Sequence, residues 1–97
     1  MNNVQRYSGF IKRIVTAPIP IRKKLLHSSN SDIVKAIVEI IINIRHRNIE
    51  LPREHLVQLA KRRRLINKLL SINDLKRQRE FLVAHCETLT PLRYVFK

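Results

Sequence analysis

Apolar residues follow a helical pattern through the middle of this chain. From residue 33 to about residue 45 almost every position is Ile, Val or Ala, and only Lys35, Glu39 and Asn43 recur as a thin polar stripe at every fourth position. A helix that is apolar nearly all round is buried nearly all round. The β-branched run at residues 40–44 would also suit a strand, but the polar stripe at helical spacing favours a helix. The pattern therefore predicts a central, buried helix.

Polar residues and prolines mark the starts of two helices in the first half of the chain. Ser29 and Asp32 have the spacing of a capping box, with Asp in the place of the usual Glu, and they predict the start of the central helix. Proline is tolerated in the first turn of a helix. Pro18 and Pro20 therefore predict a short helix over residues 19–27.

Two further helices are expected after the polar connection at residues 45–48. Pro52 suits the first turn of a helix over residues 52–70, and a fourth helix is expected over about residues 74–86. Arg63 falls inside the apolar arc of the third helix. We therefore expect its side chain to point inward, where it either extends past the edge of the core or pairs with an acid such as Glu39.

These elements predict an all-α fold, a compact bundle of three to four helices. The bundle is expected over residues 18–87, preceded by a basic N-terminal arm over residues 1–17 and followed by a short extended C-terminal tail over residues 88–97. The arm carries apolar side chains that could dock on an apolar surface. A single glycine in the chain argues against β-hairpins, whose tight turns favour glycine. The length allows one small domain.

Neither a membrane span nor a disulfide is expected. The most apolar stretch is about twelve residues long and contains two charges, whereas a membrane-spanning helix needs about twenty apolar residues. The first residues are polar and lack the apolar core of a signal peptide. Cys86 is the only cysteine and cannot close an intramolecular disulfide. We therefore expect an intracellular or particle-associated protein.

The charge of the chain points to its partner. Twenty Lys and Arg against seven Asp and Glu give a formal net charge of +13. Residues 1–30 carry six bases and no acid, residues 31–60 are neutral, and residues 61–97 carry ten bases and three acids. Solvated faces normally mix both signs. An excess of one sign therefore indicates a polyanionic partner.

Most of the basic side chains lie in four clusters, at residues 22–24, 45–47, 61–64 and 76–79. Several such side chains together neutralise phosphates without reading base sequence. The chain has no Trp and only five Tyr and Phe, so a base-stacking surface is not expected. We therefore favour duplex DNA as the partner, with RNA as the second candidate. The predicted nucleic-acid-binding residues are Arg22, Lys23, Lys24, Arg45, Arg47, Lys61, Arg62, Arg64, Lys68, Lys76, Arg77 and Arg79.

The sequence contains no recognisable catalytic or metal-binding pattern. A single glycine cannot build a glycine-rich phosphate loop. His27, His46, His55 and His85 are far apart and lack the spacing of metal ligands. His85 and Cys86 would point about 100° apart on a helix, which is a poor geometry for a nucleophile and its base. We therefore expect no enzyme activity, no catalytic residue, no metal and no cofactor.

Several short segments occur in a characteristic order: IRKKLL at 21–26, DIVKAI at 32–37, NIEL at 48–51, LINKLL at 65–70 and KRQREFLV at 76–83. This order resembles a family of short basic proteins encoded by Polinton-like elements and adintoviruses of animals. The resemblance covers about residues 13–92. It implies a virion- or element-encoded protein that packages DNA, in a role like that of adenovirus core proteins. It also implies a location in the virion and the host nucleus, with capsid protein as a further partner.

The chain departs from the family pattern at two places. The family tends to have a glycine before the asparagine of the second loop, where this chain has Arg47 before Asn48. The family also tends to have a Gly-Gly-aromatic stretch and a longer apolar tail after the fourth helix, where this chain reads His85-Cys86-Glu87. Functions of the family's longer tail, such as membrane activity or capsid docking, are therefore not expected of this chain on the basis of the resemblance.

Three classes of function are open at this point. The leading one is a sequence-nonspecific DNA-binding and DNA-condensing protein, such as a viral core protein. The second is a structural RNA-binding subunit of a ribosome or another ribonucleoprotein particle. The third is a capsid-internal scaffold or interaction protein that binds an acidic partner. Homo-oligomerisation is also expected, because the central helix has more apolar surface than three short neighbours cover.

Overall fold

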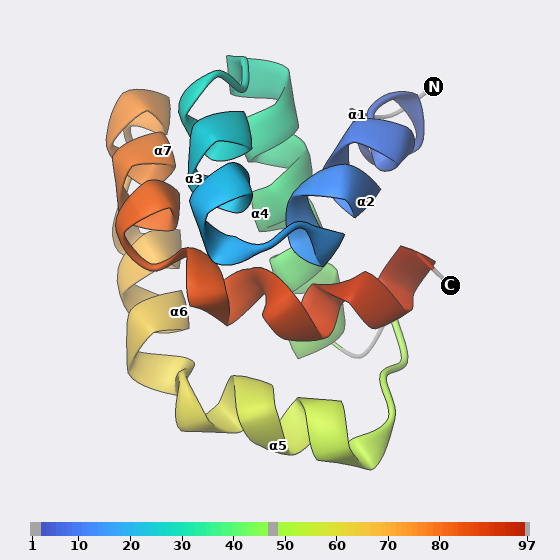
Figure 1. The fold of residues 1–97 in the computed structure, drawn as a ribbon. Helices are drawn as coiled ribbons and strands as arrows, with labels where there is room; N and C mark the ends of the chain where they lie inside the picture. Colours follow the sequence, from blue (N-terminus) through green and yellow to red (C-terminus); the bar gives the residue numbers. More distant parts are fainter. Residues whose placement is uncertain (1–2, 47–48, 97) are drawn as a thin grey trace.

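The chain is all-α throughout the residues that the computed structural model describes, which are 3–46 and 49–96 (Figure 1). Within these residues there are seven α-helices, more than the three to four predicted, and no strand. A 3₁₀ helix, η1, follows the last of them. The elements are α1 (Asn3–Arg6), α2 (Ser8–Thr16), α3 (Ile19–His27), α4 (Ser31–Arg45), α5 (Arg53–Lys61), α6 (Arg63–Ser71), α7 (Leu75–Ala84) and η1 (Cys86–Phe96).

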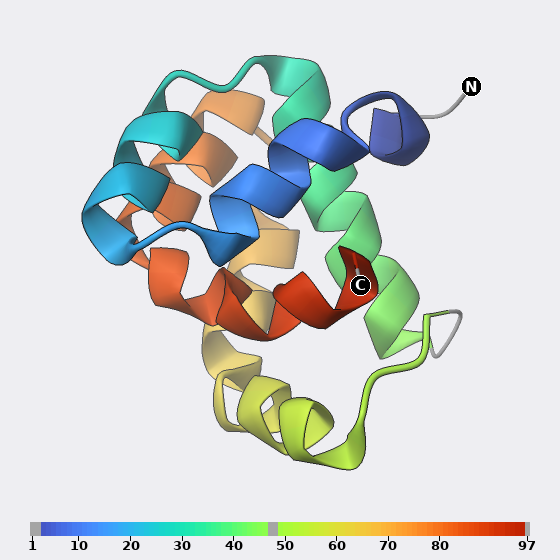
Figure 2. The same cartoon turned by 45° about the vertical axis from the view of Figure 1, so that its right-hand side comes forward.

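The central helix predicted from the apolar run is α4. Lys35 and Glu39 of the predicted polar stripe are exposed, while the other faces are largely covered. α1 and α7 both pack on α4, which runs through the middle of the molecule (Figure 2). The buried residues of α4 are Ile33, Val34, Ala36, Ile37, Ile40, Ile41 and Ile44. The predictions for this helix and for α3 over residues 19–27 are therefore confirmed.

The N-terminal cap of α4 is not the predicted capping box. Asn30 is the cap residue, and its Oδ1 accepts a hydrogen bond from the backbone N–H of Ile33 at 2.9 Å. Ser29 is buried and turns back toward α3, where its hydroxyl donates to the carbonyl of Leu26 at 2.6 Å. The prediction was wrong by one residue because both Ser29 and Asn30 are good cap residues.

Replacing Asn30 by alanine is expected to lower the free energy of unfolding by about 1 kcal/mol, because the Ile33 N–H loses its acceptor. Asn30→Asp retains an acceptor and should retain the stability. Urea denaturation followed by circular dichroism measures both. Ser31→Ala is the matched control, since no hydrogen bond of the Ser31 hydroxyl is found among the described residues. An equal loss in Ser31→Ala would contradict the assignment of the cap.

The predicted N-terminal arm is part of the fold. α2 lies against α3 and η1, and α1 packs on α4. Ile11, Ile14 and Val15 of α2 are fully buried, and their spacing places them on one face of a helix. The apolar face recognised in the sequence thus docks on the protein's own core. α2 ends at Thr16 and α3 begins at Ile19, so only two residues separate the two helices.

The C-terminal segment is not the extended tail predicted for residues 88–97. Most of it belongs to η1, which packs on α2, α3 and α5. Cys86, Leu89 and Leu92 are fully buried. A 3₁₀ helix has three residues per turn, so this spacing of three places all of them on one face. Pro91 lies inside η1 and is itself buried.

The helix predicted over residues 52–70 is divided in two at Arg62. The Arg62 backbone has φ −104° and ψ 18° and joins α5 to α6 at an angle (Figure 1). All four residues from Lys61 to Arg64 are basic, so no apolar side chain holds the chain to the core there. α5 packs on η1 and α6. Residues on either side of Arg62 therefore do not share one helical face, and Arg63, predicted to point inward, is exposed.

Candidate nucleic-acid interface

α3 and α7 lie side by side and bring two predicted basic clusters together (Figures 1 and 2). Lys23 and Lys24 are exposed on α3, and Lys76 and Arg77 are exposed on α7. His27 of α3 lines a hollow with residues of α7, and Lys23 lies one helical turn before His27 on the same side of α3. Two clusters that are about fifty residues apart in the sequence therefore contribute to one surface.

The start of α7 is fixed by side chains. The Asp74 carboxylate accepts a hydrogen bond from the Lys76 N–H at 3.1 Å, and the Gln78 amide donates to the carbonyl of Ile72 at 2.9 Å. These bonds hold Lys76 and Arg77 in the first turn of the helix. Cations there oppose the helix dipole, which favours negative charge at the N-terminus. An anion bound beside this turn would interact favourably with the dipole and with both side chains.

A hollow of about 360 Å³ lies between α3 and α7. It is lined by His27, Lys76, Arg79, Glu80, Val83 and Ala84. Arg79 is half-buried, and its Nε has no hydrogen-bond partner among the described residues. A buried donor without an acceptor costs about 1–3 kcal/mol. The atom itself is shielded from solvent, so this cost is borne within the fold.

α6 adds a further pair of cations. Arg64 and Lys68 are four residues apart, so they lie on one face of the helix, and both are exposed. α6 contains no acid and packs on α7. We call seven cations of α3, α6 and α7, without Arg22 and Arg63, the basic surface. It consists of Lys23, Lys24, Arg64, Lys68, Lys76, Arg77 and Arg79.

Lys61 and Arg62 lie apart from Arg64 and Lys68 because the helix is divided between them. Lys61 is exposed at the end of α5. Arg62 is half-buried, and its Nη1 lies 3.9 Å from Oε1 of Glu87. Ion pairs of partly exposed side chains contribute little to stability. Lys61 therefore belongs to a neighbouring surface, where Arg62 is already paired with an acid.

Arg22 was predicted to bind nucleic acid, but the structure buries it. Its side chain is only 4% exposed, so it cannot reach a phosphate. Its removal from water lowers the pKa of its guanidinium, and the nearby Cys86 and Glu87 partly oppose this effect. An arginine remains charged even so. Nε donates to the carbonyl of Ile14 (2.9 Å), Nη1 to the carbonyl of Cys86 (2.9 Å) and the hydroxyl of Thr90 (2.8 Å), and Nη2 to the carbonyls of Val15 (2.9 Å) and Ala17 (3.1 Å).

Two other predicted residues are not placed on the basic surface. Arg47 lies outside the described residues. Arg45 is exposed at the end of α4, where it lines an apolar groove between α4, α5 and α6. Arg63, which the sequence suggested would point inward, lines the same groove from α6.

A cationic and aromatic hollow was missed in the sequence. It is lined by Lys12 and Thr16 of α2 and by Arg93, Tyr94 and Phe96 of η1. The Arg93 guanidinium lies 5.1 Å from the centre of the Tyr94 ring. These residues lie in the segments that the sequence predicts as an N-terminal arm and a C-terminal tail, and no local pattern indicates that the two segments contact each other. The spacing of three among the apolar residues of η1 would have shown that Arg93 lies on its outer face.

The described residues include no group of three or more His, Cys, Asp or Glu that could hold a metal ion. In this same part of the chain, no helix is both long enough and apolar enough to cross a bilayer.

Comparisons of the chain with models of known protein families, with curated proteins and with solved structures found no match. What the surface can bind therefore follows from its own charge, exposure and shape. α3, α6 and α7 carry one acid between them, Glu80. A surface with so few acids repels cations and attracts polyanions.

Proposed function

We propose that this protein binds duplex DNA through its phosphates, without reading base sequence, and condenses it. The observation that carries the proposal is the basic surface, to which three packed helices contribute seven cations and only one acid. Contacts of this kind position a protein on a duplex but carry no sequence information.

The groups near these cations support binding without base readout. Asn and Gln are the side chains that read adenine, and Arg reads guanine when its guanidinium is held in place. Gln78, on α7, is already bonded to the carbonyl of Ile72. Lys23, Lys24, Lys68 and Lys76 act as point charges, which suit phosphate rather than a base edge. No sequence preference is therefore expected.

The size of the molecule suits one turn of a duplex. Its longest extent is 31 Å, close to the helical repeat of B-DNA of about 34 Å. A duplex of that length presents about twenty phosphates, of which those facing the protein can meet the basic surface. Together with the resemblance to proteins of Polinton-like elements and adintoviruses, this supports a role in packaging a DNA genome in the virion and host nucleus.

A salt series tests the proposal. Fluorescence anisotropy would measure binding to labelled duplex DNA, duplex RNA and single strands of about 20 nucleotides between about 50 and 300 mM salt. We expect duplex DNA to bind best, with a slope of log K against log salt of about −4.5 to −6.3 for five to seven phosphate contacts. Two duplexes of unrelated sequence should bind within about twofold of each other. Absence of binding at about 50 mM salt would overturn the proposal, and preference for duplex RNA would favour a ribonucleoprotein subunit instead.

A further inference from the structure

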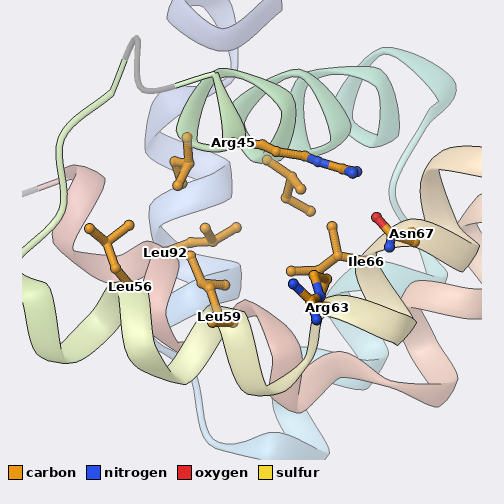
Figure 3. Close-up of a pocket in the computed structure, with 10 residues that line it drawn as sticks. Arg45, Leu56, Leu59, Arg63, Ile66, Asn67 and Leu92 are labelled. Atoms are coloured by element: carbon orange, nitrogen blue, oxygen red, sulfur yellow. The ribbon is translucent and has the colours of Figure 1, made fainter.

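An apolar groove opens between α4 and the pair formed by α5 and α6 (Figure 3). Its floor consists of four buried side chains, Ile41, Ile44, Leu59 and Leu92. The groove has a volume of about 180 Å³. A cavity of about 150 Å³ is enough to hold benzene in another protein. The groove can therefore take at least one large apolar side chain.

The edge of the groove is cationic. Arg45 extends from α4 toward Asn67 on α6, and Arg63 lies beside Ile66 at the start of α6 (Figure 3). Both arginines are exposed, and no described acid pairs with either guanidinium. Leu56 stands at the opening and is 42% exposed. An apolar floor is thus bordered on two sides by unpaired positive charge.

The groove follows from the division of the chain at Arg62. α5 rests on η1 and α6, and Leu92 of η1 reaches through to the floor of the groove. A straight helix over residues 52–70 would instead have placed its apolar residues on one face, against the core. Because α5 packs on η1, α5 and α6 do not close over α4. The groove between them therefore stays open at the protein surface.

We propose that this groove binds an acidic amphipathic helix of a partner protein. Such a helix places apolar side chains at i, i+3 or i+4, and i+7 into a hydrophobic groove. Its carboxylates would flank these anchors and bind Arg45 and Arg63 in charge-assisted hydrogen bonds. The apolar floor offers nothing to a nucleic-acid backbone. The site is therefore separate from the basic surface and adds a protein partner to the proposed function.

The charge of the chain argues against a second copy as the occupant. Each copy carries a formal net charge of +13, and two copies would repel each other. The Arg45 and Arg63 guanidinium groups would meet a partner with twenty cations and seven acids. An acidic helix would instead be attracted to Arg45 and Arg63 at the edge of the groove.

Two fluorescein-labelled peptides of identical composition test the site. The first has about sixteen residues, with Leu at i, i+4, i+7 and i+11 and Glu and Ala elsewhere; the second has the same residues in scrambled order. Both carry the same charge, so general attraction to a basic protein cancels. At about 150 mM salt we expect the amphipathic peptide to bind at least about tenfold more tightly than the scrambled one. Methyl resonances of Ile41 and Ile44 should shift only with the amphipathic peptide.

Matched variants locate the binding. Leu56→Asp and Arg63→Glu should each weaken binding of the amphipathic peptide about tenfold or more. Val57→Asp changes the next residue, which is 47% exposed and does not line the groove, and should leave the affinity within about twofold. Arg64→Glu removes as much charge as Arg63→Glu but from the basic surface. It should weaken DNA binding and spare the peptide. Circular dichroism confirms that each variant is folded.

Several results would overturn the proposal while leaving DNA binding intact. Equal affinity for both peptides would show attraction by charge alone, as would equal effects of Leu56→Asp and Val57→Asp. A dimer in sedimentation that Leu56→Asp dissociates would assign the groove to a second copy. Binding of decanoate that depends on Leu56, without binding of the peptide, would assign it to a small amphiphile.

Discussion

Replacing Arg22 by methionine is expected to lower the free energy of unfolding by about 3–5 kcal/mol, because several buried acceptors would be left unsatisfied. Methionine fills a similar space but donates nothing. Four carbonyls and the Thr90 hydroxyl would then lose the donors that the guanidinium supplies. A domain of this kind has a total stability of about 5–15 kcal/mol. The variant should therefore be close to unfolding, as measured by urea denaturation with circular dichroism.

Two controls separate this role from a surface charge. Lys23→Met removes a cation at the next, exposed position and should change the stability by less than about 0.5 kcal/mol. Arg22→Lys keeps the charge, but one ammonium cannot reach acceptors on α2, on η1 and after α2 at once. Arg22→Lys should therefore restore less than half of the unfolding free energy that Arg22→Met loses. If Arg22→Met is as stable as the natural chain but binds DNA more weakly, Arg22 contacts phosphate after all.

Neutralising four cations of the basic surface should weaken DNA binding by about 10²- to 10⁴-fold at about 0.1 M salt. The variant carries Arg64→Gln, Lys68→Gln, Lys76→Gln and Arg77→Gln, all at exposed positions. Each phosphate contact contributes about 0.9 to the slope of log K against log salt, so four lost contacts reduce the slope by about 3–4. Anisotropy across the salt series measures both quantities on the same protein.

The matched variant loses four charges elsewhere. Arg6→Gln, Arg13→Gln, Lys35→Gln and Arg53→Gln change exposed residues of α1, α2, α4 and α5. Each variant lowers the formal net charge of +13 by four, to +9. We expect this variant to lose no more than about tenfold in affinity and less than about 1 in slope. Similar losses in both would mean that net charge, and not the basic surface, determines binding.

The sequence predicted the elements whose residues interact locally. The polar stripe of Lys35 and Glu39 identified α4, and the prolines at 18 and 20 placed α3 at the residues where it is found. A helix reveals its buried face through its own spacing. The all-α fold could be read in this way without knowing which helices pack together.

The sequence did not predict what depends on distant partners. Arg22 looks like Lys23 and Lys24 beside it. Its burial depends on nearby carbonyls at the end of α2 and on a carbonyl and a hydroxyl of η1, which are 64 and 68 residues away. A local signal did exist. Arg22 lies one turn before the buried Leu26 and so shares its face.

The candidate site could be predicted in part. Lys23, Lys24, Lys76 and Arg77 are exposed, as a phosphate-binding role requires. Their placement on one surface depends on the packing of α3 against α7, which no local pattern shows. The apolar groove could not be predicted, because it exists only where the chain divides at Arg62 and α5 rests on η1.

The hydrogen bonds of Arg22 also set the order of events during synthesis. Arg22 leaves the ribosome 64 residues before Cys86 and 68 before Thr90. At about 5–20 residues per second, this is an interval of several seconds. Until those acceptors arrive, burying the guanidinium between α2 and α3 would leave part of a charged group unsatisfied. The growing chain therefore keeps this charge in water, and the core around α2 closes only after residues 86–90 have been made.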